Sequence, residues 1–174
     1  MKKLISTLFL ISVSLSSLMA QNAARNTGDF AIDAGVGIGS FSEGTALVLP
    51  PLKVDAEYTV LNFGPGSLSV GAYFSLASSR LTSYDMKYTL FLVGPMVDVR
   101  CALGDNFDIF GKLVVGYVGA STTDPLVNEY IKGSHAAAAA YVGGTWYFSP
   151  KMGVGLEAGY GGPTTFGIHM TFKI

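Results

Sequence analysis

The sequence is short of charged residues. Only 13% of its 174 residues are charged, against about a quarter in soluble globular domains, while 49% are hydrophobic and 22 are glycine. It has one cysteine, Cys101, so an internal disulfide cannot form and a disulfide-stapled scaffold is excluded. It also has no basic patch, so nucleic acid is not an expected partner.

The chain also lacks a hydrophobic run that could form a membrane-spanning helix after its first 20 residues. A spanning helix needs about 20 consecutive apolar residues. The longest candidate, Tyr88–Val99, is interrupted by Gly94 and Pro95 and carries Asp98. An apolar chain without such a run can still cross a membrane as a closed β-barrel, because helices and closed barrels both pair every backbone polar group in lipid.

The amino terminus has the layout of a secretory signal peptide. A basic start, an apolar stretch and a small-residue exit follow one another: Lys2–Lys3, Leu4–Val13 and Ser14–Ala20. A membrane-anchoring helix is the alternative, but the apolar stretch is short and serines follow it. We therefore predict export, cleavage after Ala20, and one mature domain over residues 21–174.

The end of the chain alternates between apolar residues and small or polar ones. The apolar positions are Phe166, Ile168, Met170, Phe172 and Ile174. Side chains of a strand point to opposite faces in turn, so this pattern predicts a β-strand with one apolar face. The segment before it, Met152–Tyr160, alternates in the same way, so the two form a closing hairpin.

The same alternation recurs along the whole mature chain. It predicts eight strands, which are Asp29–Ser40, Leu52–Leu61, Ser67–Ser79, Met86–Cys101, Phe107–Gly119, His135–Phe148, Met152–Tyr160 and Phe166–Ile174. Spanning strands need about 9 to 11 residues, and long connections mostly alternate with short turns. The predicted fold is an all-β, eight-stranded antiparallel up-and-down transmembrane β-barrel, with both mature ends in the periplasm.

The sequence also predicts a connection, a bulge and the loops that could bind surface ligands. Phe41–Pro51 is expected to be a polar connection, and the fourth strand is expected to bulge near Gly94–Pro95, because its start is apolar on both faces. Surface ligands, if bound, should use three exposed loops: Phe41–Leu49, Arg80–Asp85 and Ala120–Ser134.

The face opposite the apolar one carries most of the charge. Its members are Asp33, Lys53, Asp55, Glu57, Asp98, Arg100, Lys112, Glu157, His169 and Lys173. Eight strands enclose an interior just wide enough for side chains, and buried charges there must pair. Without Lys2 and Lys3 the chain carries 9 basic and 12 acidic residues, so we predict an internal salt-bridge network. No catalytic, metal-binding or cofactor-binding residue is predicted.

Four stretches of the sequence resemble a known family. They are Leu49–Tyr58, Phe107–Tyr117, Tyr141–Gly161 and the final strand FGIHMTFKI. The chain is similar to the small outer-membrane β-barrel proteins common in Bacteroidota, themselves of the OmpX and OmpA-barrel type. The resemblance implies location in a bacterial outer membrane, contact with its lipid, and delivery by periplasmic chaperones and the barrel-assembly machinery. It implies no substrate, and we expect a monomer with a structural or surface-interaction role and no enzymatic activity.

Three alternatives stay open at this stage. A soluble lipocalin-like barrel would turn the apolar face inward and the charges toward water. A small pore would use Arg100, Lys112 or Glu157 along its path. A lipid-modifying enzyme would need a hydrolytic site, for which Glu157 and His169 on adjacent strands are the candidates.

Overall fold

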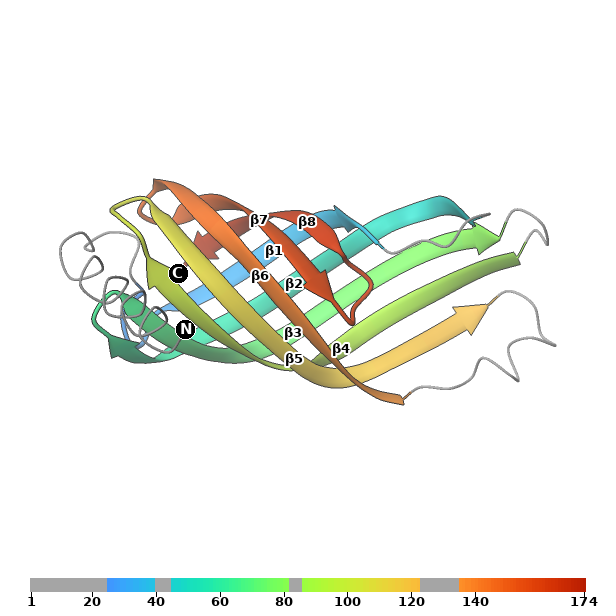
Figure 1. Ribbon diagram of the computed structural model, residues 1–174, viewed down its shortest axis with the longest axis horizontal. Helices are drawn as coiled ribbons and strands as arrows, with labels where there is room; N and C mark the ends of the chain where they lie inside the picture. The colour runs from blue at the N-terminus through green and yellow to red at the C-terminus, as the bar shows by residue number, and fades with distance from the viewer. Residues whose placement is uncertain (1–24, 40–44, 82–85, 123–134) are drawn as a thin grey trace, which may run out of the picture.

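The protein is a closed barrel of antiparallel strands in sequence order (Figure 1). The computed structural model describes residues 25–39, 45–81, 86–122 and 135–174, so the predicted signal peptide lies outside the described residues. The strands are β1 (Phe30–Ile38), β2 (Thr45–Phe63), β3 (Gly66–Leu81), β4 (Met86–Ala102), β5 (Phe107–Thr122), β6 (His135–Ser149), β7 (Met152–Tyr160) and β8 (Phe166–Lys173). The described residues contain no helix long and apolar enough to cross a membrane.

The first and last strands close the barrel. β1 pairs antiparallel with β8 from Ala31↔Lys173 to Ile38↔Phe166. β8 also pairs with β7, as the closing hairpin of the sequence predicts. The predicted fold class, eight antiparallel strands that form a closed barrel, is confirmed.

The alternation of apolar and polar residues in the sequence corresponds to the alternation of side chains between the outside and the inside of the barrel wall. On β6, Val142 and Trp146 point outward and are 64% and 52% exposed, whereas Tyr141 and Thr145 point inward and are buried. The outward apolar residues predicted for the closing hairpin follow the same rule, since Ile168 and Phe172 are exposed while His169 and Thr171 are buried. The apolar face is therefore the outer surface, and the polar face is the interior.

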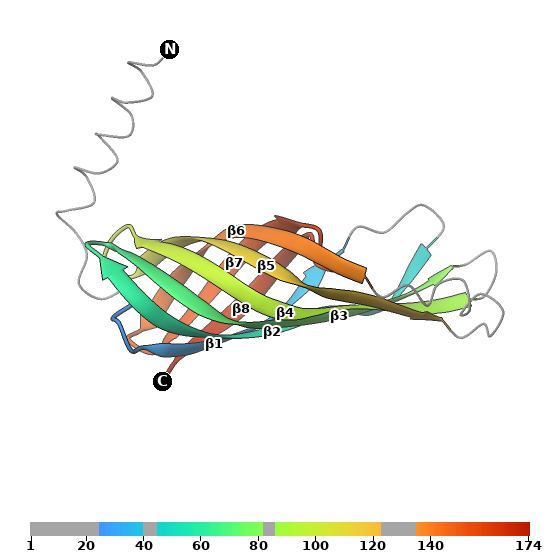
Figure 2. The ribbon, with the colours of Figure 1, turned by 90° about the horizontal axis from the view of Figure 1, so that it is seen from below.

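The strands differ in length, and the barrel is correspondingly uneven. β1, β7 and β8 have 8 or 9 residues, whereas β2 to β6 have 15 to 19. The extra residues of β2 to β5 project beyond the short strands at one end, and the carboxyl terminus lies at the other (Figure 2). One wall of the barrel thus extends as a sheet past the rest.

The expectation of a loop over Phe41–Pro51 is wrong for its second half. β2 begins at Thr45, and its pairing with β3 shifts between Leu47 and Leu49 and again between Leu49 and Leu52. Two prolines are tolerated there because β1 pairs with β2 only as far as Leu52, so Pro50–Pro51 lies on a strand edge. In the same way, β3 includes Arg80 and Leu81, and β5 includes the stretch Ala120–Thr122. The remaining residues of the three predicted binding loops lie outside the described residues.

The expected bulge at Gly94–Pro95 is absent. β4 pairs with β3 in unbroken register from Gly66↔Cys101 to Leu81↔Met86, and its register with β5 is the same on both sides of the proline. Pro95 points outward and is exposed. A Cβ at Gly94 would lie 2.5 Å from the Cα of Gly116 on β5, so these two glycines let the strands approach closely beside a residue that cannot donate a backbone hydrogen bond.

Candidate functional site: the polar interior of the barrel

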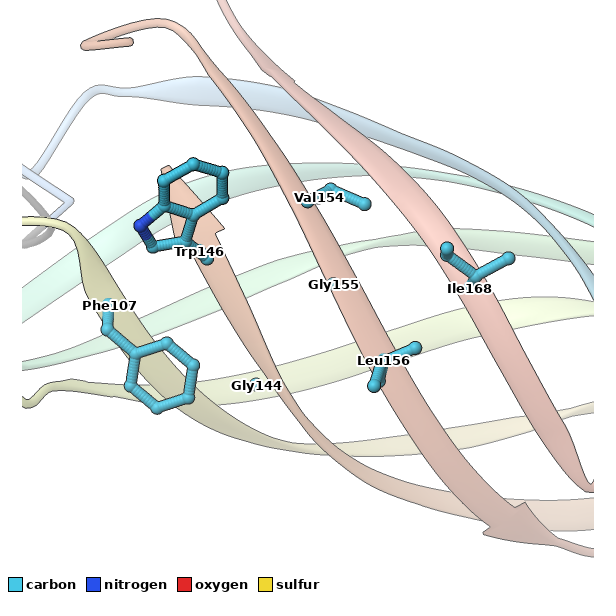
Figure 3. A pocket seen from close by; sticks show the side chains of 7 residues that line it. All are labelled: Phe107, Gly144, Trp146, Val154, Gly155, Leu156 and Ile168. Atoms are coloured by element: carbon cyan, nitrogen blue, oxygen red, sulfur yellow. The ribbon is translucent and has the colours of Figure 1, made fainter. Parts of the chain in front are cut away.

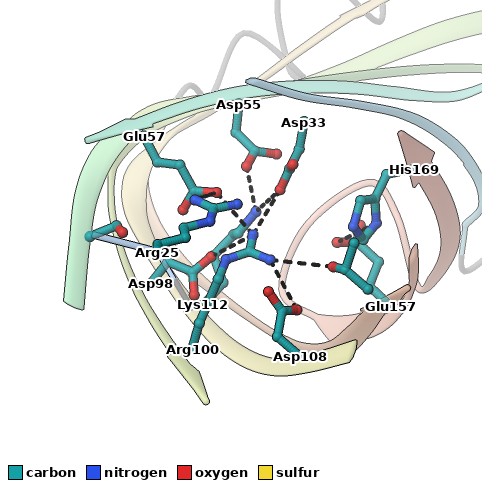
Figure 4. Close-up of polar contacts among 12 residues, drawn as sticks. Arg25, Asp33, Asp55, Glu57, Asp98, Arg100, Asp108, Lys112, Glu157 and His169 are labelled. Carbon is teal, nitrogen blue, oxygen red and sulfur yellow. Dashed lines mark hydrogen bonds and ion pairs between the residues drawn. The ribbon is translucent and has the colours of Figure 1, made fainter. Parts of the chain in front are cut away.

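The barrel interior holds the charged residues that the sequence places on its polar face. Nine of them are buried, with at most 4% of their surface exposed: Asp33, Lys53, Asp55, Glu57, Asp98, Arg100, Lys112, Glu157 and His169. They come from β1, β2, β4, β5, β7 and β8 and converge on one region of the interior (Figure 4).

Arg100 is the centre of this cluster. Its Nη2 lies 2.9 Å from Asp33 Oδ2, 2.9 Å from Glu57 Oε1 and 3.0 Å from Asp98 Oδ2. Its Nη1 lies 3.5 Å from Asp108 Oδ1 and donates a hydrogen bond of 3.3 Å to Thr145 Oγ1. The planar guanidinium presents five donors, which is why one arginine can serve several carboxylates at once.

Two lysines continue the cluster away from Arg100. Lys112 Nζ binds the carboxylate of Asp55 and lies 3.6 Å from Asp33 Oδ2. Lys53 Nζ binds the carboxylate of Glu157 and lies 3.8 Å from Asp55 Oδ1. Ion pairs thus run without a break from the β2 wall across the interior to β7.

One aromatic ring, that of Phe110, contacts two cations of the cluster. The ring of Phe110 on β5 lies 4.7 Å from the guanidinium carbon of Arg100 and 5.4 Å from Lys112 Nζ. These distances are within the roughly 6 Å over which a ring face attracts a cation. The Phe110 ring therefore stabilises the positive charges of both Arg100 and Lys112.

His169 and Glu157, the sequence-based candidates for a hydrolytic pair, lie close together, but both have other contacts and both are buried. His169 Nδ1 lies 4.0 Å from Glu157 Oε2, and the same oxygen binds Lys53. The His169 ring packs edge-on against Phe110 with 5.6 Å between ring centres. Both residues are buried, so a substrate outside the barrel does not reach them.

Glycines on β7 make room for the large interior residues. The inward positions of this strand are Gly153, Gly155, Glu157 and Gly159. A Cβ at Gly155 would collide with the His169 ring, and one at Gly159 would collide with the Tyr141 ring. These glycines are needed because eight strands leave no spare width.

Lys173 has a different environment from the other predicted members. It lies at the end of β8 and is half-buried, and its ammonium stands 4.1 Å above the Tyr147 ring. Tyr147 in turn donates a hydrogen bond of 2.9 Å to Asp108 Oδ2. Lys173 therefore belongs to the rim of the cluster rather than to its centre.

Two charged residues of the interior were missing from the predicted set. One is Asp108, which lies between the outward residues Phe107 and Ile109, so the alternation of β5 is the sequence signal for its inward position. Arg25 precedes β1 and so has no alternation to reveal it. It is 1% exposed and forms an ion pair with Glu57.

The segment that carries Arg25 is held against the barrel by backbone hydrogen bonds. Gly28 N–H donates to Thr59 O, and Thr59 N–H donates to Asp29 O, both at 2.9 Å. Asn26 N–H donates to Asp29 Oδ2 at 2.7 Å and closes a turn. This turn directs the Arg25 side chain into the barrel at the end where β1 starts.

An apolar layer lies next to the charged cluster in the interior. Its buried members are Tyr73, Leu92, Met96, Val114, Ala139 and Tyr141. The rings of Tyr73 and Tyr141 stack with 5.4 Å between their centres. The interior thus contains a charged layer and an apolar layer side by side.

Three carboxylates have the spacing of a metal site but already have other partners. Oxygens of Asp33, Asp55 and Glu57 lie within 4.8 Å of one another. The side chains of Arg100 and Lys112 contact these same carboxylates. The donor set is therefore neutralised by the protein's own cations and does not call for a metal ion.

Comparisons with known proteins give a structural answer only. No family model and no curated protein matches the sequence. The attachment invasion locus protein Ail of Yersinia pestis, solved with the heparin analogue sucrose octasulfate, has a TM-score of 0.54 and 10% identity over 86% of this chain and 100% of its own. The amino-terminal β-barrel domain of Pseudomonas aeruginosa OprF has a TM-score of 0.53 and 11% identity over 86% and 100%.

A third neighbour is Neisserial surface protein A, with a TM-score of 0.52 and 11% identity over 86% of this chain and 98% of its own. All three are outer-membrane proteins built as eight-stranded barrels. The fold is that of an eight-stranded outer-membrane β-barrel. At these identities the likeness extends to the architecture of the barrel and not to any ligand.

Proposed function

We propose that the protein is an integral barrel of a bacterial outer membrane with a structural or surface-interaction role and no catalysis. One observation carries the proposal: large apolar side chains cover the outside of every strand, while the charged cluster around Arg100 is buried inside. Soluble proteins rarely expose a contiguous apolar patch larger than a few hundred Å². A band of this kind around a closed barrel is stable in hydrocarbon.

The soluble lipocalin-like alternative requires the opposite arrangement. Such a barrel would bury Val142, Leu156 and Ile168 and expose Arg100 and Lys112. These apolar residues are 48 to 66% exposed, and both cations are 2% exposed. The facing of the strands therefore supports the membrane reading over the soluble one.

Cell fractionation combined with heat-modifiable migration tests the proposal. The mature chain, residues 21–174, should be recovered from outer membranes only with detergent, and it should migrate differently before and after boiling. Recovery from the periplasm without detergent would overturn the proposal. Mass spectrometry of the same preparation should find Gln21 as the first residue, because we propose cleavage after Ala20.

We place the surface-interaction role at the end of the barrel where β2 to β5 project. Two of its connections, residues 39–44 and 123–134, are longer than any at the opposite end, where residues 64–65, 103–106 and 150–151 join the strands. Longer connections face the exterior in outer-membrane barrels, and short turns face the periplasm. Replacing the segments 40–44, 82–85 and 123–134 with short linkers should abolish binding to host or envelope ligands and preserve the barrel. Unchanged binding would remove the support for this placement.

Neither remaining alternative gains support from the interior. Conduction needs a wetted path, but Arg100, Lys112 and Glu157 are at most 4% exposed and belong to one continuous set of ion pairs. Catalysis by Glu157 and His169 needs access that their burial denies. We therefore propose that the polar network holds the barrel wall together.

The partners follow from the location. We propose that membrane lipid surrounds a monomer, which periplasmic chaperones and the barrel-assembly machinery deliver. We also retain the Bacteroidota-type subfamily as a proposal that rests on the sequence resemblance. Accumulation of the unfolded chain after depletion of the assembly machinery would test the delivery route, and normal insertion would refute it.

A further inference from the structure

A hollow lies on the outward face of β5 to β8, centred on Gly144. Its volume is about 440 Å³, and its walls are Phe107, Trp146, Val154, Leu156 and Ile168 (Figure 3). The two aromatic rings stand on one side of Gly144, and the aliphatic side chains stand on the other. The hollow exists because Gly144 occupies an outward position without a side chain.

A second, more polar hollow of about 260 Å³ adjoins the first. Asp105 and Asn106 line it from the turn between β4 and β5. Ser149, the last residue of β6, and Pro150, in the turn that follows, line its other side. Trp146 lines both hollows. An apolar groove thus continues into a polar hollow at the end of the barrel with short turns.

We propose that these two hollows form one binding site for a glycerophospholipid with an amine head group. One acyl chain lies along the groove over Gly144, and the head group lies in the hollow beside Asp105. The inference rests on the proposed membrane location, which makes hydrocarbon the medium around the groove. Short turns face the periplasm, so the site lies in the periplasmic leaflet, which glycerophospholipids form.

The polar hollow has the chemistry of a zwitterionic head group. Asp105 is the one charged residue that lines it, and its carboxylate attracts an ammonium group. Ser149 Oγ accepts a hydrogen bond of 3.0 Å from Met152 N–H, which leaves its hydroxyl hydrogen for a phosphate oxygen. The indole N–H of Trp146 is a further donor at the boundary between tail and head. A lipid with net negative charge would be repelled by Asp105.

The combined volume of the groove and the hollow is large enough for a segment of a lipid. Ligand sites usually enclose roughly 300 to 1,000 Å³, and the groove and hollow together fall in this range. A second copy of the chain is the competing occupant of an apolar groove. The charged and polar hollow that continues it favours a lipid, because a partner barrel would present another apolar wall at this depth.

Native mass spectrometry of the full mature protein, with added phosphatidylethanolamine or phosphatidylglycerol, tests the proposal. Wild type should retain one phosphatidylethanolamine molecule and retain it better than phosphatidylglycerol. Gly144→Leu should lower retention about tenfold, as expected when roughly two methylene groups leave the groove. Its Cβ would lie 2.7 Å from the tip of the Phe107 ring, which is the movable end of a side chain, and 3.1 Å from the backbone oxygen of Asp108.

Matched variants separate the site from general effects. Val142→Leu adds bulk on the same face of β6 outside the groove, so lipid retention should not change. Asp105→Asn should equalise retention of the two lipids. Trp146→Phe removes the N–H and serves as a second groove variant if Gly144→Leu does not fold.

Some outcomes would overturn the lipid site and leave the membrane proposal intact. One is equal retention of phosphatidylethanolamine by wild type, Gly144→Leu and Trp146→Phe, when all three migrate as heat-modifiable barrels. The others are a preference of wild type for phosphatidylglycerol, and the detection of protein dimers in place of lipid adducts. Failure of wild type to migrate as a heat-modifiable barrel would instead count against the proposed function.

Discussion

Removing Arg100 tests whether the interior ion pairs hold the barrel together. In Arg100→Met the side chain keeps an apolar stem of similar length and loses its charge. Four carboxylates then lose a partner: Asp33, Glu57, Asp98 and Asp108. Three of them keep another, since Lys112 contacts Asp33, Arg25 contacts Glu57, and Tyr147 donates to Asp108.

Asp98 is the residue that would be stranded. Within the described part of the chain, Arg100 is the one cation within ion-pair distance of Asp98, which is fully buried. Removing one partner of a buried ion pair costs about 3 to 5 kcal/mol, because it leaves a charge without water or a counter-charge. We therefore expect the free energy of unfolding to fall by about this amount in Arg100→Met.

Reversible urea unfolding in lipid vesicles measures the change. The single tryptophan, Trp146, points outward and reports on the transfer from lipid to water. Lys151→Met is the control, because it also removes one positive charge but lies in an exposed turn. Its effect should stay within about 0.5 kcal/mol. The double variant Arg100→Met, Asp98→Asn should regain about 0.5 to 3 kcal/mol of the loss.

The reasoning fails if Arg100→Met is no less stable than Lys151→Met. It also fails if Asp98→Asn restores nothing, since the cost would then come from packing rather than from a stranded charge. Folded fractions from heat-modifiable migration would provide the comparison if Arg100→Met cannot be refolded in vesicles.

Three further predictions concern the wall and the interior. Gly159→Ala should destabilise the barrel by about 1 to 3 kcal/mol in the same urea assay, because its Cβ meets the Tyr141 ring. Gly111→Ala, where the added Cβ meets nothing within 4 Å, should be neutral, and equal effects would refute the packing argument. Leu113→Arg, on the outward face, should cost up to about 2 to 4 kcal/mol, and a neutral result would place this face in water. Purified wild type should not conduct in planar bilayers, and steady single-channel currents would show that the interior is wetted.

The period-two pattern was enough to predict the architecture. On β6, apolar Val142 and Trp146 alternate with Tyr141 and Thr145, and the local pleat of a strand converts that order directly into outside and inside. The same logic assigned Lys53, Asp55 and Glu57 to one face of β2. The face of the strand to which a side chain points depends only on its position along that strand, so it can be predicted from a single sequence.

The local sequence pattern gave wrong predictions at two proline-containing segments, where pairing with neighbouring strands determines the structure. The sequence Pro50–Pro51 suggests the end of a strand. β2 nevertheless continues through it, and its pairing with β1 reaches only to Leu52, so the prolines do not have to donate backbone hydrogen bonds to β1. The sequence Gly94–Pro95 suggests a bulge. The ladder between β3 and β4 is nevertheless continuous, the register between β4 and β5 is the same on both sides of the proline, and Gly116 accommodates the close approach. Pairing across strands therefore overrides the local preference of proline.

The sequence by itself determined which side chains point into the barrel and that their charges had to pair. Only the tertiary structure decided which charges meet, because that depends on the register and tilt of eight strands. Arg100 on β4 reaches Asp33 on β1 and Glu57 on β2, which are more than 40 residues away in the chain. Arg25 lies outside every strand, and only the turn that docks it against Thr59 brings it to Glu57. Which side chains point inward is determined within each strand, whereas the ion-pair partner of each charged side chain is determined by the closure of the whole barrel.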